Sequence, residues 1–161
     1  MSKELLLLLS AAALSACQSL PRTEDVKAEV GTASQRWATA FNECNSSKAA
    51  ALYDNASVLW GTVSASIISS RAGVAQYFER VCAANPQPKV VFGEQQIRVY
   101  GDIALNSGTY TFTVFPAGQA RQFPARFSFA YRKHEGQWLI VDHHSSALPA
   151  PPTAPAAPAR Q

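Results

Sequence analysis

Residues 127–147 read FSFAYRKHEGQWLIVDHHSSA, and this stretch decides the fold class. Aromatic side chains recur at every second position from Phe127 to Tyr131, and apolar ones do the same from Trp138 to Ile140. A period of two is typical of β-strands, whose successive side chains point to opposite faces of a sheet. The sequence HEG between the two runs suits a tight connection. The stretch therefore predicts an antiparallel pair of strands.

The same period extends upstream to Pro88, where the NPQP sequence interrupts the chain. We expect four long strands over residues 89–100, 103–115, 120–133 and 137–147. Gly101-Asp102 and Pro116-Ala117-Gly118 provide the other two tight turns. Four strands joined by short connections predict an antiparallel meander.

The region before the strands has helical periodicity. Thr32 and Gln35 form a capping-box pattern that is followed by Trp37 and Phe41, so a helix is expected from residue 32. A short helix over 46–53, a short strand over 57–61 and a third helix after Ser70 follow. Helices followed by a meander predict an α+β fold, with the helices on one face of a curved sheet.

The two ends of the chain have compositions that a folded core does not use. Residues 1–16 contain an apolar run too short to span a bilayer, as in a secretory signal peptide. Leu14-Ser15-Ala16-Cys17 resembles the lipobox of bacterial lipoproteins, although an ordinary signal peptide with a chance cysteine is the alternative. Residues 17–30 are interpreted as a lipidated N-terminus and tether, and Pro/Ala-rich residues 149–161 as a disordered tail. The domain itself is expected over 31–148.

Lipidation of Cys17 would place the protein in the bacterial periplasm, on the membrane. Acyl chains contribute about 0.8 kcal/mol for each buried methylene. The residue after Cys17 is Gln18, which by resemblance to sorted lipoproteins favours the outer membrane. Because that compartment is oxidising, we expect Cys44 and Cys82 to form a disulfide, the alternative being two buried thiols.

Charge and histidine spacing exclude several kinds of site. The 161 residues carry a formal charge of +3 without a basic cluster, so nucleic acid is not an expected partner. No cofactor is expected. His143 and His144 are adjacent in a predicted strand, so one points to each face and a shared metal site is not expected.

The aromatic row of Phe123, Phe127, Phe129 and Tyr131 indicates which face is buried. If Trp138 shares that face, strict alternation places Asp142 and His144 in the interior, as a proton-handling pair or as a satisfied buried network. The expected ligand pocket consists of Tyr53, Trp60, Phe127, Asp142, His144 and Ser146. Leu139 and Val141 then lie on the outer face, where an apolar surface predicts a homodimer.

The terminal strand also resembles a known family. Gly136, Trp138, Ile140, His144 and Ser146 fit the pattern of the nuclear-transport-factor-2-like (SnoaL-like) superfamily, and in particular the bacterial relatives of the calcium/calmodulin-dependent kinase II association domain. The resemblance implies a cone of curved sheet around helices, an internal pocket and assembly through the sheet. It implies no kinase activity.

One part of the sequence departs from that family's pattern. Phe127 and Phe129 stand where the kinase's hub domain carries polar residues, which favours a dimer over a ring.

Three functions are compatible with these features. The first is a lipid-anchored periplasmic domain that binds an unknown small molecule or mediates assembly. The second is an isomerase or lyase with Asp142 and His144 as an acid–base pair and Tyr53 or Tyr77 as a donor. The third is an interaction module of the cell envelope. The sequence names no substrate.

Overall fold

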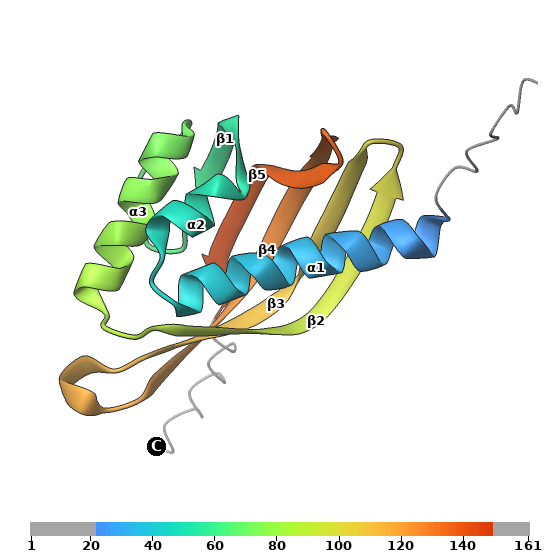
Figure 1. Ribbon diagram of the computed structural model, residues 1–161. Coiled ribbons are helices and arrows are strands. Elements are labelled where there is room, and N and C mark those ends of the chain that lie inside the picture. The colour runs from blue at the N-terminus through green and yellow to red at the C-terminus, as the bar shows by residue number, and fades with distance from the viewer. Residues whose placement is uncertain (1–21, 150–161) are drawn as a thin grey trace, which may run out of the picture.

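A computed structural model describes residues 22–149, so the predicted signal peptide, the lipidated Cys17 and most of the Pro/Ala-rich tail lie outside the described part. Figure 1 shows helices packed on one face of a curved sheet, which confirms the α+β prediction. The elements are α1 (Thr23–Asn42), α2 (Ser46–Ala51), β1 (Tyr53–Trp60), α3 (Arg71–Ala84), β2 (Lys89–Tyr100), β3 (Ile103–Val114), the short 3₁₀ turn η1 (Pro116–Gly118), β4 (Arg121–His134) and β5 (Gln137–Ala147).

The sheet has the strand order β1-β5-β4-β3-β2. Strands β2 to β5 form the expected antiparallel meander. Strand β1 is added at the far edge and runs parallel to β5. The helices cover the concave inner face, and the β3–β4 hairpin projects beyond them (Figure 1). The opposite face of the sheet, called the outer face below, carries no helix among the described residues.

Helix α1 begins earlier than the sequence analysis expected. The residues assigned to a tether are helical from Thr23 onward, and Val26 and Val30 are buried on the same stripe as Trp37. Thr32 lies in the middle of this helix, where its hydroxyl donates to the carbonyl of Ala28 at 2.9 Å and caps nothing. The charged residues around Val26 had masked the helical period. The tether prediction is therefore wrong for residues 23–30.

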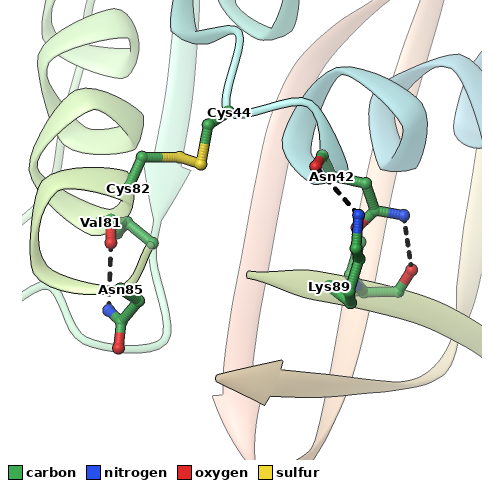
Figure 2. Close-up of a disulfide and its surroundings, with 7 residues drawn as sticks. Asn42, Cys44, Val81, Cys82, Asn85 and Lys89 are labelled. Atoms are coloured by element: carbon green, nitrogen blue, oxygen red, sulfur yellow. Dashed lines mark hydrogen bonds between the residues drawn. A yellow bond between two sulfur atoms is a disulfide. The ribbon is translucent and has the colours of Figure 1, made fainter. Parts of the chain in front are cut away.

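A disulfide and a pair of hydrogen bonds hold the C-terminal end of α1 in place (Figure 2). Cys44 and Cys82 form the expected disulfide, with 5.7 Å between their Cα atoms, and join this end to α3. Beside it, the Asn42 side chain accepts from the Val90 amide at 2.6 Å and donates to the Val90 carbonyl at 3.2 Å. Because β2 is an edge strand, these bonds satisfy backbone groups that would otherwise lack a partner.

Aromatic rings fill the space between α1 and the sheet. Trp37 is central, and its ring lies 5.3 Å from that of Phe129 and 6.0 Å from that of Tyr110. Phe127, Phe129 and Tyr131 are buried along β4, which confirms that this part of the aromatic row faces inward, whereas Phe123 is 50% exposed. Within the described residues, no helix combines the length and apolarity needed to cross a membrane.

A β-bulge in β5 changes the predicted orientation of the residues beyond it. Tyr131 pairs with Ile140, but Ala130 pairs with Asp142, so Val141 is an extra residue. An extra residue interrupts the alternation of side chains. The inward-facing residues of β5 therefore have even numbers up to Ile140 and odd numbers from His143 onward. His143 is 2% exposed.

Candidate functional site

The bulge separates the residues that were expected to line one pocket. Asp142 and His144 are exposed on the outer face, and the prediction that they face the interior is wrong. Trp60 is 42% exposed and pairs with His144 across β1 and β5, so it also lies on that face. Ser146 follows the same parity and is half-buried.

Of the six expected residues, only Tyr53 and Phe127 are inside the cone. Tyr53, which was expected near the pocket mouth, is fully buried. The six side chains therefore do not line a common pocket.

The interior contains a different polar group that the sequence analysis did not identify, here called the interior polar chain. It comprises Trp37, Tyr53, His143, Tyr110, Ser145 and Thr62. Tyr53 Oη lies 2.7 Å from His143 Nδ1, and Tyr110 Oη lies 3.4 Å from His143 Nε2. Ser145 then contacts both Tyr110 and Thr62 through its hydroxyl. Apart from Thr62, which is half-buried, the members of this chain are buried.

The donors in this chain run in one direction. Trp37 Nε1 can only donate, so the Tyr53 hydroxyl accepts from it at 3.0 Å and uses its own proton toward His143 Nδ1. A neutral His143 then carries its proton on Nε2, which faces Tyr110. The Tyr110 hydroxyl donates onward to Ser145.

Burial keeps these groups uncharged. It lowers the pKa of His143 to about 3, with a smaller contribution from neighbouring His144. Burial also raises the pKa of the Tyr53 and Tyr110 hydroxyls well above their usual range. At neutral pH, the interior polar chain is therefore neutral and fully paired, which suits a polar anchor for the fold better than acid–base chemistry.

The empty space beside this chain is small. The cavity lined by Tyr77, Tyr110, His143, Ser145 and aromatic residues of the core measures ≈ 20 Å³, about enough for one water molecule. The Tyr77 ring packs directly against Gly61, where a methyl group would overlap it. Side chains therefore fill the expected internal pocket.

Larger hollows lie on the surface. One of ≈ 600 Å³ runs between α1 and the start of β5. There the Glu29 carboxylate accepts from Lys133 Nζ at 2.6 Å and from Trp138 Nε1 at 2.8 Å, and these bonds lower the pKa of Glu29. The Glu29 carboxylate in this hollow is thus already paired within the chain.

Another hollow, of ≈ 340 Å³, lies on the outer face and is here called the outer-face pocket; it is lined by Arg126, Phe127, Ser128, His144 and Ser146. In residues 22–149, no three His, Cys, Asp or Glu side chains gather as a metal site would require. The outer-face pocket contains an arginine that forms no ion pair within residues 22–149, together with two serines and His144.

Sequence reasoning missed His143 and Ser145 for a definite reason. No residue type marks Val141 as a bulge, and the extra residue becomes visible only when β5 is paired with β4. Tyr110 and Thr62 reach the same place from β3 and from the loop after β1. Their convergence depends on strand order, which periodicity does not give.

Comparison with known proteins defines the family. The sequence model of the calcium/calmodulin dependent protein kinase II association domain matches residues 26–149, most of the chain. The chain belongs to this association-domain family. A crystal structure of a protein assigned as such an association domain, from Xanthomonas campestris, is 37% identical, with a TM-score of 0.70; the match covers 75% of this chain and 86% of that one.

More distant structures share the fold of this association domain. A protein from Streptomyces avermitilis, assigned as a dehydratase of the NTF2-like family, has a TM-score of 0.73 at 16% identity, covering 80% of this chain and 100% of that one. An NTF2-like protein from Novosphingobium aromaticivorans with a cystatin-like fold has a TM-score of 0.68 at 15% identity, covering 78% and 83%. These matches confirm the NTF2-like fold that the terminal strand predicted. No functionally curated protein matches the sequence of this association domain.

Proposed function

We propose that this association domain is a lipid-anchored periplasmic assembly domain that pairs with a second copy through the outer face of its sheet. The observation that carries the proposal is the contrast between the two faces. Aromatic side chains fill the inner face and leave ≈ 20 Å³, whereas the outer face has no covering element among residues 22–149. The family's name, association domain, agrees with such a role.

The outer face has the composition of a protein interface. Its central row is partly apolar, with half-buried Leu105, Ala130 and Val58 on either side of Asp142. Trp60, Tyr100 and arginines surround this row, and these residue types carry much of the binding energy in interfaces. A homodimer of this kind is isologous, because each copy presents the same patch to the other.

The composition differs in one respect from the sequence expectation. Leu139 and Val141, expected as the apolar centre of the outer face, are half-buried, and Trp60 and Tyr100 are more exposed. The contact we propose therefore centres on β4, the middle strand of the sheet, and reaches Trp60 on β1.

Two features support the compartment. The lipobox-like residues before Cys17 fit a lipoprotein, and the Cys44–Cys82 disulfide fits an oxidising periplasm. The isomerase or lyase alternative is less well supported, because Asp142 and His144 lie on the outer face away from the interior. Binding of a small molecule inside the cone would require Tyr77 or its neighbours to move.

Sedimentation equilibrium of the purified protein tests the pairing. We expect twice the monomer mass at micromolar concentration and the monomer mass for Ala130→Arg, which places a long charged side chain at the centre of the outer face. Gln35→Arg, on the exposed side of α1, is the matched control and should remain dimeric. A wild-type protein that stays monomeric, or a dimer that Ala130→Arg leaves unchanged, would contradict the proposal.

A further inference from the structure

Four polar side chains form a compact rectangle on the outer face. Arg126 on β4 pairs with Ser146 on β5, and Ser128 pairs with His144. Their neighbours Phe127 and Ser145 are buried, so these four project to the outer side. Paired strands lie about 4.8 Å apart and alternate residues about 6.6 Å apart, which brings the four side chains around one small area.

The arginine in this rectangle is oriented but carries no counter-charge. Arg126 Nε donates to Ser146 Oγ at 3.0 Å, which leaves its two terminal nitrogens to point elsewhere. No carboxylate within residues 22–149 forms an ion pair with Arg126. Arg132, on the same strand and face, differs in this respect because Nη2 lies 2.9 Å from the Asp54 carboxylate.

The other polar side chains that line the outer-face pocket can also donate hydrogen bonds. Ser128 and Ser146 carry hydroxyls, and His144 adds a ring N–H, while no acidic side chain lines the hollow. The polar track continues across the sheet, where Ser107 Oγ lies 3.3 Å from Ser128 Oγ and 3.4 Å from Arg98 Nη2. A second guanidinium thus borders the same area.

We propose that the outer-face pocket binds an oxyanion of the phosphate or carboxylate type. The two terminal nitrogens of Arg126 bind two oxygens of such a group in parallel, and Ser128 and His144 donate to the others. Trp60, beside His144 on the next strand, offers an apolar surface to the rest of the ligand. One copy supplies all of these groups, and the site lies on the same outer face that the proposed pairing would use.

The three histidines allow a direct test by NMR of their ring C–H groups. Adding inorganic phosphate to the purified protein at constant pH should shift the His144 signals with saturation. His143, which is buried, and His134, at the end of β4, should not respond. Sodium chloride at equal ionic strength is the control for general charge attraction. Equal shifts of His134 and His144, or the same shifts with chloride, would overturn the proposal.

Two matched variants assign the effect to Arg126. We expect Arg126→Gln to weaken phosphate binding by about tenfold or more, because a charge-assisted bidentate contact is lost. Arg132→Gln removes the same charge from the same strand but from an arginine already paired with Asp54, and should leave the affinity unchanged. Both positions are exposed, so folding should survive in both. Equal losses in the two variants would reduce the site to net charge and overturn it.

The source of the oxyanion is settled by two further ligands. Glycerol 3-phosphate represents a free small molecule, and phosphatidylglycerol vesicles represent a lipid headgroup. A His144 response to glycerol 3-phosphate supports a soluble ligand, and a response to vesicles alone supports a headgroup. A response to neither, and none to inorganic phosphate, would rule out the site. Sedimentation of the same samples reports the pairing, so failure of the oxyanion site and failure of the pairing are told apart.

Discussion

His143 lies inside the cone, bonded through both ring nitrogens, while His144 beside it lies on the outer face. This separation follows from the geometry of a strand and needs no special chemistry. The consequence is electrostatic. An imidazole held between Tyr53 and Tyr110 without a carboxylate is stable only when neutral, so the fold resists its protonation.

The stability of the fold should therefore depend on pH through His143. The folded pKa is about 3 and the ordinary value is 6.5, so the unfolded chain binds the extra proton below pH 6.5. The free energy of unfolding should fall by about 1.4 kcal/mol per pH unit as the pH drops from 6.5 toward 3. Urea unfolding at several pH values measures this slope.

Two variants assign that slope to one side chain. His143→Asn should be less stable at neutral pH but should lose this component of the pH dependence. His144→Gln, at the exposed neighbour, should keep it. Identical slopes in the wild type and His143→Asn would show that another group is responsible.

The residue scale is also where sequence reasoning was least successful. It correctly placed one histidine on each face, and it correctly buried the aromatic row from Phe127. The prediction placed His144 and not His143 in the interior, because the extra residue Val141 reverses which side chains of β5 point inward. The pairing of β5 with β4 decides that point, and alternation within β5 alone does not show it.

At the scale of elements, the sequence was more informative. Strands β2 and β5 begin and end at the predicted residues, since alternation and turn residues are local signals. The start of α1 and the parallel addition of β1 were not predicted. Both depend on tertiary contacts, as Val26 shows by packing against the core from a highly charged segment.

Two glycines should respond in opposite ways to substitution by alanine. Gly31 lies within α1, and a methyl group there would meet Ile97 Cδ1 at 3.7 Å, an ordinary contact. Gly31→Ala should therefore stabilise the protein by about 0.5 to 1 kcal/mol through helix propensity. At Gly108 a methyl group would overlap the Glu94 carbonyl oxygen at a bulge in β2, so Gly108→Ala should cost about 1 to 3 kcal/mol.

Thermal unfolding of the two variants under the same conditions measures both effects. A stabilised Gly108→Ala would show that the β2–β3 pairing tolerates a shift at this bulge. A destabilised Gly31→Ala would show that the contact between α1 and Ile97 is tighter than the distance indicates.

The disulfide between the turn after α1 and helix α3 should contribute strongly to stability. It closes a separation of 38 residues, and the loop-entropy model gives about 3 to 4 kcal/mol for such a crosslink. Urea unfolding of the Cys44→Ala, Cys82→Ala double variant should show a loss of this size. Reductant should lower the wild type toward the variant and leave the variant unchanged; a reductant effect of equal size on both would contradict the assignment.

The whole molecule must be considered together with its predicted membrane anchor. Because α1 begins at Thr23, only five residues separate the domain from Cys17. A chain of that length spans at most about 20 Å when fully extended. If Cys17 is acylated, the start of α1 is held close to the bilayer surface. A tether that extended to residue 30 would let the domain lie farther from it.

Cell fractionation tests the anchor. We expect the wild-type protein in the membrane fraction and Cys17→Ser outside it, since the variant offers no sulfur for acylation. Cys44→Ala, which leaves Cys17 intact, is the control and should remain with membranes. Recovery of Cys17→Ser with membranes at the wild-type level would count against lipidation.

The extra residue at Val141 has a practical consequence for comparing this chain with its relatives. Counting residues forward from Trp138 assigns the wrong face of the sheet to every residue beyond Val141. Counting backward from Ser145 assigns the correct face. A homologue that lacks this one residue would keep the same imidazole and hydroxyl on the inner face of the sheet. An alignment would nevertheless place them one column away. Gain or loss of a single codon, more than any substitution, would then decide how the end of this strand should be aligned.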